Sequence, residues 1–120
     1  MADHGLSAAW KGTVAGREKQ SMDLWADALT FAEKQKADAN IEEYTVQLFT
    51  PTGGAIPAGI LTYWGSEEQV LALLADEERT RIAQRANLLL EGFAEARTMR
   101  GEAVMEGVNE YSEIIDSLDR

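Results

Sequence analysis

Apolar and polar positions alternate in two short runs near the middle of the chain, at residues 41–49 and 59–64. In the first run, one side carries three of the larger side chains: Tyr44, Val46 and Leu48. In the second run, the two sides are formed by Leu61 and Tyr63 and by Ile60, Thr62 and Trp64. A period of two is typical of β-strands, and the prolines and glycines between the runs favour a turn. The pattern predicts an antiparallel β-hairpin.

The segments on either side of this hairpin have hydrophobic spacings of three and four residues, which are typical of amphipathic helices. Residues 17–37 carry one such stripe, formed by Met22, Trp25, Leu29 and Ala32. After the hairpin, Ser66 and Gln69 form a capping-box pattern that predicts the start of a second helix. This helix is expected to bury three side chains: Val70, Leu71 and Leu74. A bend is expected near Asp76, and the helical stretch beyond it carries Ile82, Ala83, Ala86 and Leu89.

Weaker signals predict two further strands, at residues 6–14 and 92–99. The end of the chain is clearer, because residues 102–118 carry an apolar seam that repeats every three or four residues. The seam consists of Val104, Val108, Tyr111, Ile115 and Leu118. Acidic residues occupy much of the remaining surface, so this segment is predicted to be a strongly amphipathic, acidic helix.

These segments follow one another as strand, helix, strand, strand, helix, strand and extra helix. We therefore expect an α+β protein, a ferredoxin-like βαββαβ sandwich with an extra C-terminal amphipathic helix. Residues 1–120 are expected to form a single domain, with the core at 6–99 and the extra helix at 102–118. Both sides of the hairpin carry apolar groups, and monomers seldom expose so large a patch. A second copy of the protein or the C-terminal helix is expected to cover the second face.

The composition narrows the classes of partner. The 120 residues suffice for one hydrophobic core, and 21 acidic against 11 basic residues give a net charge of −10. Such a chain is repelled by nucleic acids and by anionic membranes, so neither is an expected partner. The sequence has no cysteine, no signal-peptide pattern and no apolar run long enough to span a bilayer. A cytoplasmic location is expected.

The stretch from Gly16-Arg17-Glu18 to Thr62-Tyr63-Trp64-Gly65-Ser66-Glu67-Glu68 resembles the dimeric α/β-barrel superfamily, of the antibiotic-biosynthesis-monooxygenase type. Its most characteristic part is the strand ending in Trp64, followed at once by an acidic capped helix. The chain is most similar to uncharacterised small bacterial members, over residues 6–99. The resemblance implies ferredoxin-like proteins that pair sheet to sheet. It implies no single activity, because this fold carries many.

Haem-degrading members of this superfamily use a histidine on the second helix, with an asparagine and a tryptophan nearby. Trp64 matches the tryptophan, but residues 81–84 contain no histidine and residues 6–14 contain no asparagine. Haem is therefore not expected, and the sequence indicates no other cofactor. No metal site is expected either, because the paired glutamates at 42–43, 67–68 and 77–78 are adjacent and point apart.

Aromatic residues are the main candidates for ligand binding. The resemblance implies that flat apolar ligands bind between the sheet and the helices, and Arg97 on the expected fourth strand could orient an anionic group there. The candidate pocket residues are Trp25, Tyr44, Tyr63, Trp64, Phe93 and Arg97. The alternative is that these aromatic side chains only pack the core and a dimer interface, as most buried aromatics do.

Two functions remain open from the sequence. The leading hypothesis is a non-catalytic homodimeric binding or assembly module, because no catalytic set is present. The alternative is a cofactor-less monooxygenase- or isomerase-like enzyme acting on a small aromatic or polyketide-like molecule. A pocket with converging polar groups distinguishes a ligand site from simple packing. The C-terminal helix is expected to pack on its own subunit or on a dimer mate, or to bind another protein.

Overall fold

The computed structural model describes residues 2–50 and 54–118. Its main element is a four-stranded antiparallel sheet with the strand order β3-β4-β1-β6. The four strands are β1 (His4–Trp10), β3 (Glu43–Leu48), β4 (Gly59–Gly65) and β6 (Ala94–Met99). A small second sheet pairs β2 (Gly12–Thr13) with β5 (Leu90–Glu91). The predicted hairpin is therefore confirmed as β3 and β4, and the strand predicted at 92–99 is β6.

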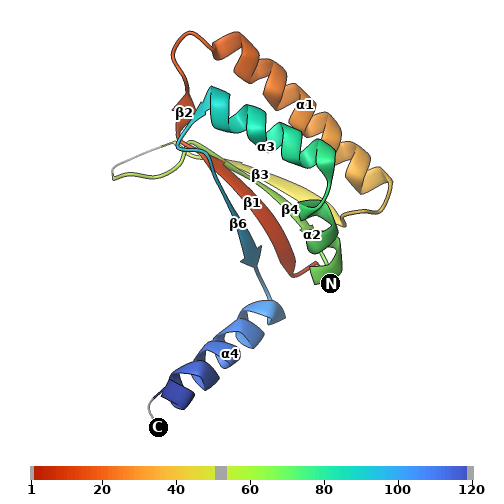
Figure 1. Ribbon diagram of the computed structural model, residues 1–120, viewed down its shortest axis with the longest axis vertical. Coiled ribbons are helices and arrows are strands. Elements are labelled where there is room, and N and C mark those ends of the chain that lie inside the picture. The colour runs from red at the N-terminus through yellow and green to blue at the C-terminus, as the bar shows by residue number, and fades with distance from the viewer. Residues whose placement is uncertain (1, 51–53, 119–120) are drawn as a thin grey trace.

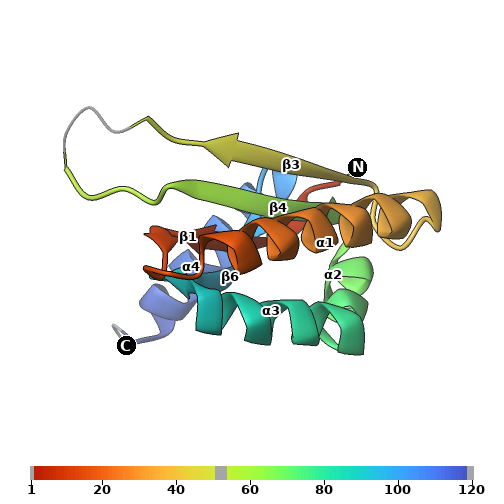
Figure 2. The same ribbon diagram turned by 90° about the horizontal axis from the view of Figure 1, so that it is seen from above.

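Two long helices, α1 (Glu18–Ala37) and α3 (Glu77–Leu89), lie side by side over one face of the sheet (Figures 1 and 2). The short helix α2 (Glu67–Leu74) lies at one end of the sheet, and α4 (Glu102–Leu118) follows β6. The architecture is the predicted α+β ferredoxin-like sandwich with an extra C-terminal helix. One boundary differs, because the predicted first strand at 6–14 is divided into β1 and β2 at Lys11.

Local capping explains where the second helical segment is divided. The Ser66 hydroxyl accepts a hydrogen bond from the Gln69 amide at 3.1 Å, and the Gln69 side chain accepts one from the Ser66 amide at 2.8 Å. This is the predicted capping box, and it satisfies two amides at the start of α2. The predicted bend near Asp76 is the boundary between α2 and α3. There the Asp76 carboxylate accepts a hydrogen bond from the Arg79 amide at 2.9 Å.

The core lies between the sheet and the helices, but the buried stripe of α1 is not the predicted one. Met22 is 65% exposed and Trp25 is half-buried, whereas Leu24 and Phe31 are buried. The buried residues of α1 are Ser21, Leu24, Ala28, Phe31, Ala32 and Gln35. The prediction chose a different side of the helix, because the buried side includes Ser21 and Gln35, and these polar residues do not contribute to a hydrophobic pattern.

The same kind of offset occurs in α2. Leu71 and Leu74 were predicted to be buried, but they are exposed, and Leu73 is buried beside Val70. The eight residues of α2 are too few for their hydrophobic spacing to identify the inner face. In α3, Ala86 is buried as predicted, and Ile82 packs against the core cluster.

The two faces of the sheet differ in composition. The register pairs Leu6 with Tyr63 and Ala8 with Leu61, and these side chains face α1 and α3. The opposite face, which we call the open face, carries the alternate residues of each strand. These include Ser7, Thr45, Ile60, Thr62, Trp64 and Thr98. The predicted division of the β4 side chains between two faces is confirmed.

Candidate functional site

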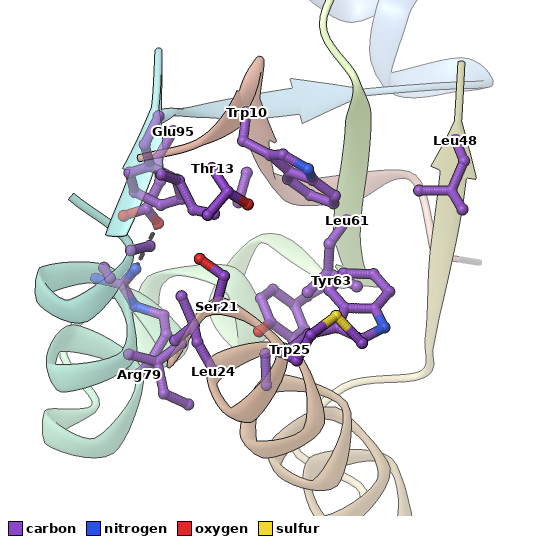
Figure 3. A pocket seen from close by; sticks show the side chains of 18 residues that line it. Trp10, Thr13, Ser21, Leu24, Trp25, Leu48, Leu61, Tyr63, Arg79 and Glu95 are labelled. Atoms are coloured by element: carbon purple, nitrogen blue, oxygen red, sulfur yellow. Dashed lines mark hydrogen bonds and ion pairs between the residues drawn. The ribbon is translucent and has the colours of Figure 1, made fainter. Parts of the chain in front are cut away.

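A cavity of about 310 Å³ lies between the sheet and helices α1 and α3 (Figure 3). Much of its wall comes from three elements: β4 contributes Leu61 and Tyr63, α1 contributes Leu24 and Trp25, and α3 contributes Ile82 and further residues. Side chains from the other strands of the sheet and from β2 and β5 complete the lining. This volume is at the lower end of the range found for ligand pockets and suits a molecule of one or two rings. Most of the lining is apolar, so a ligand that enters displaces few water molecules that are hydrogen-bonded to the protein.

Aromatic rings and exposed apolar side chains line the part of the cavity that is nearest to solvent. Trp10 and Trp25 contact each other edge to face, with ring centroids 5.4 Å apart. Met22 and Leu48 also line the cavity, yet they are 65% and 72% exposed. Exposed lining residues mark the opening to solvent, so the cavity opens between the start of α1 and the end of β3.

Tyr63 brings a hydroxyl into this apolar space. The residue is only 5% exposed, and its ring packs edge to face on Phe31 with centroids 6.1 Å apart. Burial raises the pKa of Tyr63 to about 12, with a smaller lowering effect from Arg79 and a smaller raising effect from Glu95. No hydrogen bond joins this hydroxyl to another residue in the described part of the chain. It is therefore a protonated donor, free to bind a ligand acceptor at neutral pH.

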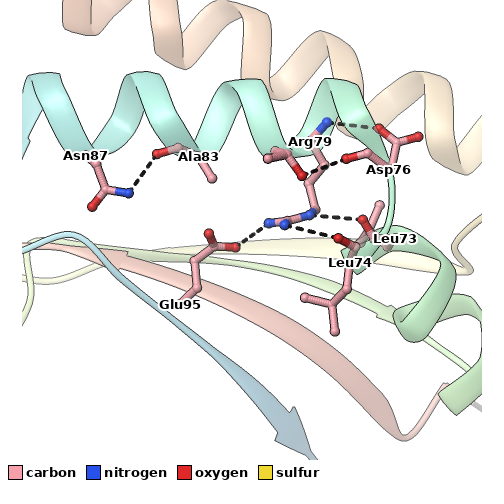
Figure 4. A network of polar contacts seen from close by, with 8 residues as sticks. Leu73, Leu74, Asp76, Arg79, Ala83, Asn87 and Glu95 are labelled. Carbon is pink, nitrogen blue, oxygen red and sulfur yellow. Dashed lines mark hydrogen bonds and ion pairs between the residues drawn. The ribbon is translucent and has the colours of Figure 1, made fainter.

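The charged groups of the cavity bind each other. The guanidinium of Arg79 donates to the Glu95 carboxylate at 2.6 Å and to the carbonyls of Leu73 at 2.9 Å and Leu74 at 3.5 Å (Figure 4). These carbonyls are at the C-terminal end of α2, and the Leu73 carbonyl also accepts a hydrogen bond from the Asp76 amide at 3.1 Å. Arg79 thus neutralises Glu95 and completes the end of α2 from within the buried layer.

The structure brings together three of the six predicted pocket residues. Trp25, Tyr63 and Phe93 line the cavity. Tyr44 packs against the core, but its hydroxyl donates to Glu33 on α1 at 2.5 Å, and this bond raises the pKa of Tyr44.

Trp64 and Arg97 lie elsewhere. Trp64 is on the open face, where its indole N–H donates to Thr45 at 2.9 Å and the Arg100 guanidinium lies 3.9 Å from its ring centroid. Arg97 is half-exposed, 3.9 Å from Glu67 at the start of α2. It lines a separate hollow next to α4.

Sequence reasoning missed the pair Arg79 and Glu95, because charged residues on a helix and on an edge strand are normally read as solvent-facing. A signal was present. The bend at Asp76 ends α2 and leaves its last carbonyls without a following helical turn, and an arginine three residues further on can reach back to them. Glu95 pairs with Ala8 in the sheet register, which places its side chain on the helix-covered face.

Within residues 2–50 and 54–118, no three His, Cys, Asp or Glu side chains lie close enough together to hold a metal ion. No helix in the same part of the chain has the length and apolar content needed to cross a membrane.

Solved structures share this fold. A dimeric ferredoxin-like protein of unknown function from Thermobifida fusca matches with a TM-score of 0.61 and 7% identity, over 82% of this chain and 92% of that one. A dimeric ferredoxin-like protein of unknown function from Bacteroides fragilis matches with a TM-score of 0.57 and 12% identity, over 81% and 95%. A Pseudomonas aeruginosa protein matches with a TM-score of 0.54 and 14% identity, over 84% and 96%.

These matches confirm the ferredoxin-like fold, and they agree with the resemblance to dimeric proteins of this architecture. No protein-family model matches the sequence, and no curated protein is similar to it. At these identities the matches establish the fold alone, so the function must be inferred from the cavity.

Proposed function

We propose that this protein is a homodimeric binding module that holds a small, largely apolar molecule in the cavity between the sheet and helices α1 and α3. The observation that carries this proposal is the Tyr63 hydroxyl, which lines an apolar cavity of about 310 Å³ and makes no hydrogen bond within the described chain. A neutral hydrogen bond contributes roughly 0.5–1.5 kcal/mol. A ligand acceptor such as a carbonyl oxygen would add such a bond, so we expect an aromatic or alicyclic ketone, ester or quinone.

Binding is better supported than turnover by the state of the polar groups. A general base must accept a proton near neutral pH, and burial keeps Tyr63 protonated. Glu95 is held by Arg79 at 2.6 Å, and the remaining donors of Arg79 point at backbone carbonyls. Arg79 and Glu95 are therefore engaged in structural contacts, and the Tyr63 hydroxyl is among the neutral donors that remain for a ligand.

The homodimer is supported by the open face and by the solved proteins of the same fold. The Thermobifida fusca and Bacteroides fragilis proteins are described as dimeric. In this chain, α1 and α3 cover one face of the sheet, and Ile60 and the half-buried Trp64 lie on the other. Trp64 and the Arg100 stacked on it are residue types that dominate many protein interfaces.

The binding proposal is tested with prodan, a fluorescent naphthyl ketone whose emission responds to apolar surroundings and to hydrogen bonding at its carbonyl. The wild-type protein is expected to bind it with a blue-shifted emission. Tyr63→Phe keeps the ring and removes the hydroxyl, so it is expected to weaken binding by roughly 2- to 10-fold, the value of one neutral hydrogen bond. Ala83→Leu places extra atoms in the cavity and is expected to weaken binding further.

Tyr44→Phe is the matched control, because it removes a tyrosine hydroxyl that points at Glu33 and lies outside the cavity. It should leave prodan binding unchanged, while thermal unfolding verifies that each variant is folded. The proposal is wrong if wild-type protein does not bind prodan, or if Tyr63→Phe and Ala83→Leu bind it as tightly as the wild type.

A further inference from the structure

Helix α4 presents an apolar surface that its own subunit leaves exposed. Only Ala103 among its 17 residues is buried. At 100° per residue, six large apolar side chains share less than half of the helix circumference. We call them the apolar arc of α4: Val104, Val108, Tyr111, Ile114, Ile115 and Leu118. The other side of the helix is mostly acidic or polar, with Met105 as the large apolar exception. The helix therefore has one face suited to protein packing and one suited mainly to water.

The size of this arc is comparable to half of a stable interface. Its six side chains are between 40% and 78% exposed. Together they expose on the order of 600 Å², against roughly 800 Å² that each partner contributes to a standard interface. A typical monomer has no apolar patch larger than this. Most of the stability of helices in proteins comes from packing of an amphipathic face, so α4 gains stability from a surface to pack on.

The position of α4 indicates which surface this is. Figure 1 shows α4 leaving the end of β6 and extending away from α1 and α3, on the other side of the sheet. Gly101 makes the turn between them with a φ of +60°. The open face and α4 therefore border the same space. A second copy stacked on the open face would lie next to α4.

Charge limits the other candidates. Residues 102–118 contain five acidic side chains and no lysine or arginine: Glu102, Glu106, Glu110, Glu113 and Asp116. Helices that lie on anionic membranes carry basic residues instead. Direct pairing of two α4 helices would bring their acidic flanks together, which is unfavourable. Packing the apolar arc on the body of a second copy brings apolar side chains into the contact and leaves the acidic side of α4 in water.

We propose that α4 is a dimer clamp, whose apolar arc packs on the body of a second copy of this chain bound at the open face. This inference rests on the homodimer of the proposed function and adds a second contact region to it. It does not involve the cavity, so ligand binding and clamping are separable.

The absence of cysteine from the sequence allows a direct test. A single cysteine is introduced as Val108→Cys in the apolar arc or as Asn109→Cys on the opposite side, and each is labelled with a benzophenone photo-crosslinker. Each labelled protein is mixed with ¹⁵N-labelled wild type and irradiated. Val108→Cys is expected to give covalent dimers near twice 13.2 kDa that link α4 to a ¹⁵N peptide of the body. Asn109→Cys is expected to give few or none.

Sedimentation of charge variants tests the energetic contribution. Tyr111→Glu combined with Ile115→Glu should weaken the dimer at least tenfold, whereas Asn109→Glu adds a charge to the polar side and should leave it unchanged. Ile60→Asp, on the open face, should also separate the subunits. The clamp is refuted if Ile60→Asp disrupts the dimer and the double variant does not, and the proposed homodimer then stands. If the wild-type protein is monomeric at every concentration, both the homodimer and the clamp are wrong. If the crosslinks join only residues of the same subunit, the clamp is wrong.

Discussion

Helices α1 and α4 have similar lengths, 20 and 17 residues, and both are amphipathic, but their surroundings are opposite. The inward-facing stripe of α1 contains the polar residues Ser21 and Gln35, and yet it is buried against the sheet. The apolar arc of α4 is uninterrupted in sequence pattern, and nearly all of it is exposed. The clarity of a hydrophobic pattern therefore does not indicate how much of it the subunit itself buries.

The difference has a physical cause. The inner residues of α1 contact side chains from β1, β4 and α3, so small or polar groups are tolerated where neighbours fill the volume or satisfy the hydrogen bonds. Gln35, for example, accepts a hydrogen bond from Asn40 at 2.9 Å. A helix with few such neighbours in its own subunit has a regular apolar face that is stabilising only when another surface packs on it. We infer that the second copy is this surface.

The largest expected contrast compares one deletion in each helix. Phe31→Ala removes a ring that is 1% exposed and packed against Tyr63, so it should destabilise the fold by about 3–5 kcal/mol. Ile115→Ala removes a side chain that is 42% exposed and should cost less than about 1 kcal/mol in the monomer. Urea unfolding at low protein concentration measures both values. Equal losses would contradict the contrast.

A second contrast compares two arginines of α3. Arg79→Met removes the donor of the Glu95 carboxylate and of the Leu74 carbonyl, together with one of the two donors of the Leu73 carbonyl, and should cost about 3 kcal/mol. Arg81→Met is the control, because Arg81 is largely exposed and 4.0 Å from Glu77, and should cost less than about 0.5 kcal/mol. Chemical denaturation checks both. A loss below 1 kcal/mol for Arg79→Met would argue against a structural role for the pair of Arg79 and Glu95.

The third contrast is in pH dependence and is expected to be the smallest. Tyr63 ionises near pH 10.0 in the unfolded chain and near pH 12 in the fold, where burial disfavours the phenolate. Below pH 10 both states are protonated; between pH 10 and 12 the unfolded chain loses the proton first, so stability falls as pH rises. The loss should reach about 2–3 kcal/mol. The difference in unfolding free energy between wild type and Tyr63→Phe separates the effect of Tyr63 from that of lysine titration. If the two proteins lose stability in parallel between pH 10 and 12, the prediction is wrong.

Much of the fold was predictable from local chemistry. The hairpin followed from alternation and turn residues, and the start of α2 followed from Ser66 and Gln69, because these signals involve residues close in sequence. The inner faces of α1 and α2 were mispredicted where the buried positions include Ser21 and Gln35 or where the helix is short. Whether these positions are buried depends on their neighbours in the folded protein, and the spacing of apolar residues along the sequence does not contain that information.

The candidate site was predictable in part for the same reason. Trp25, Tyr63 and Phe93 were identified because aromatic side chains on inward positions of this fold tend to meet between sheet and helices. Trp64 occupies the opposite face, since successive residues of a strand alternate sides. Arg79 was missed because its role is to satisfy carbonyls of another helix. Such a role becomes visible only when the end of α2 and the start of α3 are placed together.

The exchange of backbone amide hydrogens in α1 and α4 tests most directly whether a second copy covers the apolar arc. In the wild type, α1 should be protected at every protein concentration, because its own subunit buries it. Protection of α4 should increase with protein concentration and should be absent in Ile60→Asp, which lacks the partner. If α4 exchanges as fast in the concentrated wild type as in Ile60→Asp, or is equally protected in both, a second copy does not cover the arc and the account is wrong.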